Sequence, residues 1–237
     1  GVGAEVKFMT LLKSGKLGGE QVCALPFSDA TLRQMTARAS TGLPEGAGVS
    51  PDDVLTATVW RALVAMRLSQ LGLSTDCEEP TTCSRACSFR GLTRPPLGAG
   101  YCANGCSAVW TELTVRELLT MSLSAVAQRL RADLQAFTSE RVARRARWLR
   151  QQYEASCQVV HRFDKHALTF IISSVMFDVS SAVFDSLPFC FDHGMHMPVY
   201  SIFMPRAEDE GVNVYVSGTE ESLAVFAGHV ENAMYCS

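Results

Sequence analysis

The 237-residue chain has 21 Lys and Arg residues against 24 Asp and Glu, so its formal net charge is −3. A hydrophobic fraction of 47% with 19% charged residues is ordinary for a globular protein and excludes disordered and collagen-like classes. The small negative charge gives no overall attraction to nucleic acid or to an anionic membrane, and no apolar run reaches the length of about eighteen residues that a membrane helix needs. We therefore expect a cytoplasmic protein with neither nucleic acid nor membrane as a partner.

Nine cysteines are an odd number, and they lack the density of a disulfide framework, so we expect reduced thiols. Cys83 and Cys87 have the same spacing as Cys102 and Cys106, which a tetrahedral zinc site would permit. Both pairs fall in segments that look like strands, where this spacing places both thiols on one face and equally suits small buried side chains. We therefore favour buried thiols over a metal site.

The chain begins with two predicted strands, over residues 4–11 and 21–27, joined by a Gly-rich turn. Ser28 then caps a short helix, because a serine hydroxyl can accept a hydrogen bond from the first-turn amides. The face that this helix is expected to bury consists of Leu32, Met35 and Ala39.

A longer helix has the clearest start signal in the chain. Residues 50–53 provide a serine N-cap, a proline in the first helical position and an aspartate that completes a capping box. Gly72 is expected to end the helix. At its centre we expect Trp60 to anchor the core and Arg61 to be solvated or ion-paired. Its apolar face consists of Leu55, Val59, Ala62, Leu63 and Met66.

Two further strands are predicted over residues 81–90 and 101–111, with a Pro-containing loop between them. Thr114 and Glu117 then form a second capping box. We expect one continuous helix from this box, because apolar residues recur at spacings of three and four. These residues are Leu119, Leu123, Val126, Leu130, Leu134 and Phe137.

Another helix is predicted after Ser139, with Val142, Ala146, Leu149 and Tyr153 turned inward. This helix and the one before it carry seven arginines within twenty-two residues, namely Arg129, Arg131, Arg141, Arg144, Arg145, Arg147 and Arg150. Such a cluster suits the phosphates of nucleic acid or of a nucleotide-bearing cofactor. We favour a solvated helix face, because we find no aromatic platform interleaved with the arginines.

The most apolar stretch, over residues 168–177, predicts a buried central strand. A turn-like heptapeptide over residues 192–198 leads into another strand over residues 199–204. A strand over residues 211–217 and a final helix complete the pattern, and that helix has an apolar face of Leu223, Phe226, Val230 and Met234. This order predicts an α/β (α+β) fold in which a mixed β-sheet is flanked by helices in one domain.

The five histidines form no recognisable catalytic pattern, because no G-x-S-x-G, Walker, dinucleotide or H-E-x-x-H motif occurs. His193 and His196 lie close together in the heptapeptide and offer two ligands to a metal. A third ligand cannot be named, so we favour packing or hydrogen bonding for this pair and expect no metal.

Three motifs occur in consistent order along the chain. Residues 50–61 read S-x-x-D-x-L-T-A-x-x-W-R, and residues 95–104 read P-P-L-x-x-G-Y-x-x-N. The heptapeptide keeps Asp192, Gly194 and Pro198 of the pattern D-F-G-W-G-K-P. Together these motifs resemble the C-terminal half of the BAHD acyl-CoA-dependent acyltransferases, a family of chloramphenicol-acetyltransferase-like fold.

In that family, the histidine of an H-x-x-x-D motif is the general base that deprotonates an alcohol or amine, which attacks an acyl-CoA thioester. The present sequence has no H-x-x-x-D, so the resemblance implies no catalytic residue in this chain. It implies instead a missing N-terminal domain of the same protein, with residues 1–26 as its remnant or link and residues 27–237 as the C-terminal domain. The expected ligands are acyl-CoA as co-substrate and a small-molecule alcohol or amine acceptor.

The resemblance also implies a structural role for the heptapeptide. Asp192 and Gly194 are the first and third residues of the heptapeptide. In the family, the aspartate at the first position pairs with an arginine and does not touch substrate. Arg90 is its expected partner, although Ser88 replaces the acid that precedes the family's arginine. Because breaking a buried ion pair is strongly destabilising, Asp192→Ala is expected to damage folding before chemistry.

The family's T-S-W segment implies where substrate binds. Ser180, Ser181 and Ala182 match it best by spacing, residues 173–175 are a weaker alternative, and neither keeps the tryptophan. Met195, which replaces the tryptophan of the heptapeptide, is the third expected substrate-binding residue.

Two functions are compatible with these features. The favoured one is an acyltransferase fragment that is inactive alone and exposes an apolar face, so that it would aggregate without its other half. The alternative is a catalytically inactive ligand-binding or interaction module of the same fold, for which the missing H-x-x-x-D and the altered heptapeptide argue.

Overall fold

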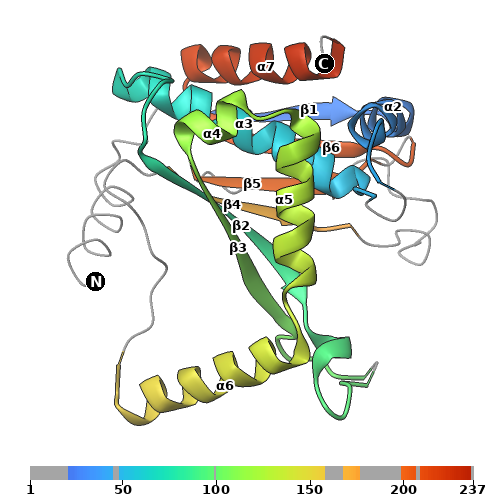
Figure 1. Cartoon of the computed structure of the whole chain (residues 1–237), viewed down its shortest axis with the longest axis vertical. Helices are drawn as coiled ribbons and strands as arrows, with labels where there is room; N and C mark the ends of the chain where they lie inside the picture. Colours follow the sequence, from blue (N-terminus) through green and yellow to red (C-terminus); the bar gives the residue numbers. More distant parts are fainter. Residues whose placement is uncertain are drawn as a thin grey trace.

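The computed structural model describes residues 21–44, 48–98, 100–157, 168–176, 199–206 and 209–235 (Figure 1). These residues form a six-stranded mixed sheet with helices packed on it. In chain order the elements are β1 (Gln21–Phe27), α2 (Asp29–Ser40), α3 (Pro51–Leu71), β2 (Pro80–Ser88), the 3₁₀ turn η1 (Arg90–Leu92), β3 (Cys106–Thr114), α4 (Val115–Thr120), α5 (Leu123–Gln135), α6 (Ser139–Glu154), β4 (Thr169–Ser174), β5 (Tyr200–Pro205), β6 (Val212–Gly218) and α7 (Glu220–Tyr235).

The sheet has the strand order β1-β6-β5-β4-β2-β3. Its centre is parallel, because β4 pairs in parallel with both β2 and β5, whereas the outer pairs β1/β6, β5/β6 and β2/β3 are antiparallel. The predicted mixed sheet flanked by helices is therefore confirmed. The apolar run after residue 167 forms its central strand, β4, although the strand ends at Ser174, earlier than predicted.

Helix α3 is the centre of the core. It is buried nearly all round, because α2, α5 and α7 pack on it while β4 lies on its remaining side. The largest fully buried side chains come from several elements that meet here: Phe27, Trp60, Leu63, Phe170, Phe203 and Phe226. Figure 1 shows α7 beside α3, and α7 also contacts the strands β6 and β1.

The predicted helix starts are confirmed in detail. The Ser28 hydroxyl accepts a hydrogen bond from the Thr31 amide at 3.1 Å, and Ser50 and Asp53 form the full capping box of α3. Gly72 ends α3 in the left-handed conformation, with φ of 62°, which favours glycine. These signals are local in sequence, so each could be recognised without knowledge of the tertiary structure.

The continuous helix predicted after Thr114 is wrong, because the chain forms two helices, α4 and α5, with an extended break at Met121. The Ser122 hydroxyl caps α5 by accepting the Ala125 amide at 3.1 Å. Arg61 of α3 reaches the end of α4 and donates hydrogen bonds to the carbonyl oxygens of Leu118, at 2.9 Å, and Met121. The half-buried Arg61 therefore binds the free carbonyls at a helix end, and within the described residues it forms no ion pair.

The predicted inward face of the next helix is also wrong. No residue of α6 is buried, and the exposed fractions of Leu149 and Tyr153 are 43% and 84%. Helix α6 lies across the end of the β2/β3 hairpin, apart from the other helices (Figure 1). The predicted strand over residues 101–111 begins only at Cys106, because a loop occupies the residues before it.

The hairpin places Cys87 beside Cys106 but keeps Cys83 apart from them. Cys83 is buried on β2 opposite Thr111, whereas Cys106 is exposed and pairs with Ser88 at the other end of the ladder. Cys102 lies in the loop, so placing both pairs in strands was wrong for this residue. Across the described ranges, no group of three or more His, Cys, Asp or Glu residues is arranged to hold a metal ion.

The predicted strand over residues 4–11 and the heptapeptide over residues 192–198 lie outside the described residues. Within the described part of the chain, no helix has the length and apolar character needed to cross a membrane.

A buried ion pair joins three elements of the core. The Asp53 carboxylate, 1% exposed, lies 2.9 Å from Arg85 Nη1 on β2 and 2.6 Å from Arg131 Nη2 on α5. The same carboxylate accepts the Ser50 backbone N–H at 2.9 Å and the Ser50 hydroxyl at 2.7 Å. Arg85 also donates to the Leu130 carbonyl at 2.7 Å. One aspartate therefore fixes the start of α3 against both β2 and α5.

A hydrogen-bond relay fixes the central strand to the same helix. Trp60 Nε1 donates to the Thr81 hydroxyl at 3.0 Å, and that hydroxyl donates to the Leu168 carbonyl at 2.8 Å. Both side chains are buried, so neither donor has water as an alternative partner. The relay aligns α3, β2 and the residue that precedes β4.

The Asp53 ion pair predicts a pH dependence of stability. Burial alone would raise the pKa of Asp53, but hydrogen bonds from Ser50 and Arg85 and the charge of Arg85 outweigh burial and leave the pKa below its ordinary value. A lowered folded-state pKa contributes stability that is present above the unfolded-state pKa and is lost as the pH falls through the folded-state pKa. We expect the urea midpoint to fall as the pH drops below the ordinary carboxyl range.

The matched variant for this test is Asp53→Asn, which cannot ionise. Its urea midpoint should lie below that of the unmodified protein near neutral pH, and the difference should shrink as the pH is lowered. A difference that stays constant with pH would contradict a stabilising charge on Asp53.

The relay predicts that replacing each of two adjacent threonines by valine changes the free energy of unfolding by different amounts. Thr81→Val leaves the buried Trp60 N–H without its acceptor and removes one donor from the Leu168 carbonyl, which still accepts the Thr82 amide at 3.0 Å. It should therefore lower the free energy of unfolding by about 2 kcal/mol. Thr82→Val, at the half-buried next position, should change it by about 0.5 kcal/mol or less. Equal effects in chemical denaturation would show that the Thr81 hydroxyl is not the stabilising group.

Candidate functional site

Most of the predicted site residues lie outside the described part of the chain. Their roles remain predictions, and they are Ser180, Ser181, Asp192, Gly194 and Met195. Arg90 and the alternative serine match at residues 173–175 are described, so the candidate site is built from these residues and from the strands that hold them.

Arg90 lies in η1, at the tip of the β2/β3 hairpin, and contacts its own loop. Its Nη2 donates to the Ala103 carbonyl at 3.3 Å, and its guanidinium carbon lies 6.0 Å from the centre of the Tyr101 ring. A Cβ atom on Gly105 would lie 2.7 Å from the guanidinium of Arg90, so a larger residue there would displace this flexible side chain. The predicted partner, Asp192, lies outside the described residues.

The P-P-L-x-x-G-Y-x-x-N motif closes the hairpin around Arg90. The Leu97 amide donates to the Arg90 carbonyl at 3.0 Å, and the Phe89 amide donates to the Gly105 carbonyl at 2.8 Å. The Asn104 side-chain oxygen accepts the Cys106 amide at 2.9 Å, which directs the chain into β3. These contacts give the motif a structural explanation that does not depend on a ligand.

The alternative serine match lies at the carboxyl end of the central strand. Residues 173 and 174 are the last of β4, and Ser174 is opposite Phe203 of the parallel strand β5. The Val175 amide donates to the Phe203 carbonyl at 2.8 Å, and Val175 and Met176 are 40% and 49% exposed. In α/β sheets, ligands bind beside the carboxyl ends of parallel strands, so this edge is a candidate ligand site.

A small polar cavity of about 220 Å³ lies on the sheet face opposite α3. Thr82, Trp110, Glu112 and Thr169 line this cavity. Thr82 is opposite both Glu112 and Thr169 in the strand register, and it points away from α3 because its neighbour Thr81 points toward that helix. Two hydroxyls, a carboxylate and an indole therefore gather on this face.

Sequence reasoning did not identify Trp110 or Glu112. Within the strand, the alternation of side chains indicates which residues share a face. It does not indicate which residues of the neighbouring strands lie beside them. Their grouping with Thr169 depends on a strand pairing between segments far apart in the sequence.

The described residues offer binding groups but no strong base or nucleophile. Burial raises the pKa of the Cys83 thiol to about 12, and burial followed by the charge of Cys106 raises the pKa of Cys87. His229 is the one histidine among the described residues, and it is exposed on α7. The described geometry can therefore position a ligand, but it holds no histidine beside the cavity or the β4 edge.

Comparison with known proteins identifies related sequences. The family model described as the Transferase family matches residues 26–233. Trichothecene 3-O-acetyltransferase TRI101 of Fusarium sporotrichioides is 35% identical over 103 residues, which cover 43% of this chain and 20% of that enzyme.

Solved structures share the fold. TRI101 of F. sporotrichioides, complexed with coenzyme A and T-2, matches with a TM-score of 0.72 and 22% identity, over 88% of this chain and 48% of that one. F. graminearum TRI101 with coenzyme A and deoxynivalenol matches with a TM-score of 0.70 and 22% identity, over 87% of this chain and 46% of that one. Vinorine synthase matches with a TM-score of 0.63 and 13% identity, over 87% of this chain and 46% of that one.

The chain thus spans about half the length of the solved proteins that it matches. The family match covers most of the chain, and its six-stranded mixed sheet is the fold of those enzymes. The chain therefore belongs to the Transferase family, that of the BAHD acyltransferases, and has their chloramphenicol-acetyltransferase-like fold.

Proposed function

We propose that this chain is the C-terminal portion of an enzyme that transfers an acyl group from acyl-CoA to an alcohol or amine of a small molecule. The observation that carries the proposal is the family match over residues 26–233. Proteins of the same fold bind coenzyme A together with T-2 or deoxynivalenol, which supports a CoA thioester as donor and a small molecule as acceptor.

The proposal assigns the catalytic base to a preceding domain. Residues 27–237 form the C-terminal domain, residues 1–26 are the link to the preceding half, and that half contributes the histidine of an H-x-x-x-D motif. The absence of this motif from the 237 residues supports the division. The enzyme uses no metal, acts in the cytoplasm, and binds neither nucleic acid nor membrane.

The reaction needs positioned groups in addition to the base. The histidine removes the acceptor proton while the acceptor oxygen or nitrogen attacks the thioester carbonyl, and the CoA thiolate leaves and is protonated. The resemblance assigns Ser180 and Ser181 to the acceptor and the developing oxyanion, where a hydroxyl donor would lower the barrier. Met195 shapes the acceptor pocket, while Arg90 and Asp192 hold the heptapeptide and hairpin together.

The alternative is a catalytically inactive ligand-binding or interaction module of the same fold. The replacement of four residues in the heptapeptide and the absence of H-x-x-x-D support this alternative. Ligand binding is compatible with both functions, so turnover and its dependence on a histidine distinguish them.

The test is an assay of the full protein, including whatever sequence precedes Gly1 in its transcript. With acetyl-CoA and a panel of alcohols and amines, we expect CoA thiol release that depends on acceptor. Replacing the H-x-x-x-D histidine by alanine should lower kcat/KM by about 10²- to 10⁴-fold. Residues 1–237 alone should show no acceptor-dependent release.

Two outcomes would favour the binding module. One is a transcript whose reading frame encodes no domain before Gly1. The other is a longer protein that binds CoA but releases thiol at a rate unaffected by the histidine substitution. A monodisperse 237-residue monomer that melts cooperatively would also argue against a chain that needs a second half.

A further inference from the structure

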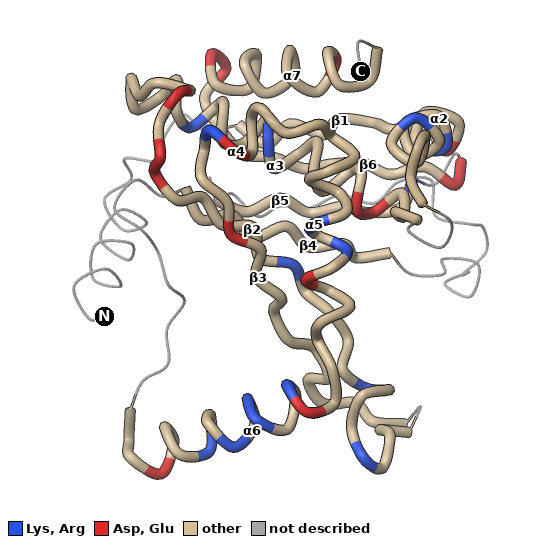
Figure 2. The backbone as a smooth tube through the Cα atoms, in the orientation of Figure 1, with Lys and Arg blue, Asp and Glu red and all other residues tan. Residues whose placement is uncertain are grey.

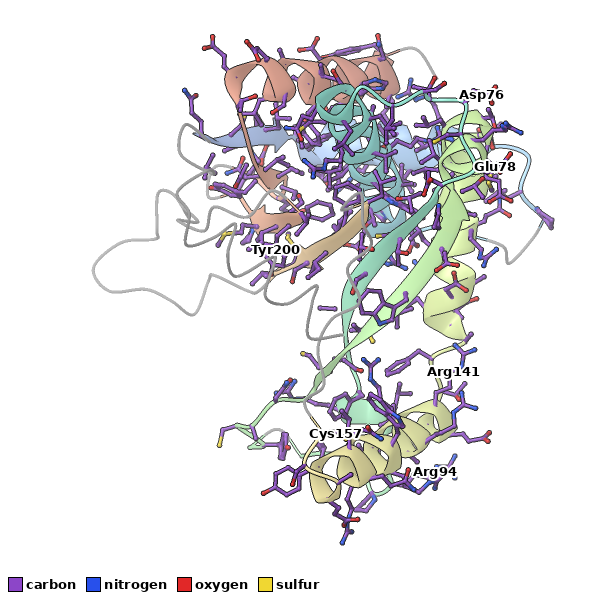
Figure 3. The ribbon with its side chains drawn as sticks, turned by 90° about the vertical axis from the view of Figure 1, so that its left-hand side faces the viewer. Asp76, Glu78, Arg94, Arg141, Cys157 and Tyr200 are labelled. Atoms are coloured by element: carbon purple, nitrogen blue, oxygen red, sulfur yellow. The ribbon has the colours of Figure 1, made fainter. Side chains whose placement is uncertain are left out.

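A second cavity lies between β3 and α6, at the end of the molecule that the hairpin forms. Its volume is about 480 Å³, within the range of small-molecule sites. It is lined by Ala108, Val109, Trp110, Phe137, Arg141, Arg144, Arg145 and Trp148. Figure 3 shows Arg141 at this end, beside the hairpin, whereas Tyr200 lies in the body of the sheet.

One side of this cavity is strongly basic. Arg144 and Arg145 follow Arg141 by three and four residues, so both lie on the same side of α6 as Arg141. Arg145 Nη1 donates to the Ala108 carbonyl at 2.8 Å and holds the helix on β3. Within the described part of the chain, the guanidinium groups of Arg141 and Arg144 make no ion pair or hydrogen bond, and no acidic residue lines the cavity.

The other side is aromatic. Trp110 comes from β3, Phe137 from the segment between α5 and α6, and Trp148 from α6 itself. The solvated-face interpretation depended on the absence of an aromatic platform beside the arginines, and the structure corrects that premise for the three arginines of the cavity. Elsewhere in the cluster, Arg129 and Arg150 pair with acids on their own helices, and Arg131 pairs with Asp53.

The arrangement favours an occupant with both an anionic group and a flat ring. Like charges at these spacings on a helix repel each other, and an anion between them removes the repulsion. Figure 2 shows basic residues along α6, with few acidic residues on the same helix. Indole and phenyl rings stack on nucleobases irrespective of base identity, and guanidinium groups bind phosphate in a forked geometry.

We propose that this cavity binds a nucleoside phosphate, with the base against the Trp110 and Trp148 side and the phosphate on Arg141 and Arg144. The nucleotide end of coenzyme A and a free nucleotide such as ADP share this chemistry. Binding requires only α6, β3 and the segment before α6, so it does not depend on acyl transfer.

The test is isothermal titration calorimetry of the full protein with adenosine 3′,5′-bisphosphate, ADP, coenzyme A and adenosine. We expect saturable binding of the phosphorylated ligands and much weaker binding of adenosine. Arg144→Gln should weaken phosphate binding about tenfold or more, since hydrogen bonds to charged groups are among the stronger ones. Trp148→Leu should weaken the binding of the nucleotides, but it should leave the binding of inorganic phosphate, titrated as a further ligand, unchanged.

The matched control is Arg147→Gln, which removes the same charge from the same helix at a position that does not line the cavity. It should change the affinity by about twofold or less, as expected for an exposed and screened charge. Circular dichroism melts of the three variants should agree with that of the unmodified protein, because all three side chains are exposed.

The ligand panel identifies the source of the nucleotide. Tighter binding of coenzyme A and adenosine 3′,5′-bisphosphate than of ADP assigns the cavity to coenzyme A, and equal binding of ADP assigns it to a free nucleotide. The proposal is overturned if no phosphorylated ligand binds saturably, or if Arg147→Gln weakens binding as much as Arg144→Gln does.

Discussion

The buried carboxylate of Asp53 is the interaction on which the arrangement of this chain depends. It lies at the start of α3 and contacts Arg85 of β2 and Arg131 of α5, so a helix start, a strand and a second helix meet at one charge. A charge this deeply buried is tolerated only when all its partners are present, because removing one leaves the others without compensation. The Ser50 capping box completes the set.

The core around α3 also positions the two candidate binding regions of the sheet. The Trp60–Thr81–Leu168 relay aligns β4 with β2, which places the polar cavity on one sheet face and the exposed end of β4 at the sheet edge. Beyond the core, the β2/β3 hairpin continues to the loop around Arg90 and carries α6 on its side. The core is thus a rigid support, and the chemistry of binding lies in the segments that project from it.

The sequence predicted the features that are local. Helix caps, the end of α3 at Gly72 and the apolar central strand are specified by neighbouring residues, and the three motifs were sufficient to recognise the family. The break between α4 and α5 was missed because Arg61, which stabilises it, lies far away in the sequence. The exposure of α6 was missed for a similar reason, since an amphipathic pattern does not tell which surface covers the apolar face.

The most direct measurement is a double-mutant cycle on the free energy of unfolding, with Asp53→Asn, Arg85→Met and the double variant. If the ion pair holds the core together, each single substitution costs about 3–5 kcal/mol, and the double variant costs at least about 2 kcal/mol less than their sum. A coupling near zero would show that Asp53 and Arg85 act independently, and the structure would then depend on apolar packing around α3 instead.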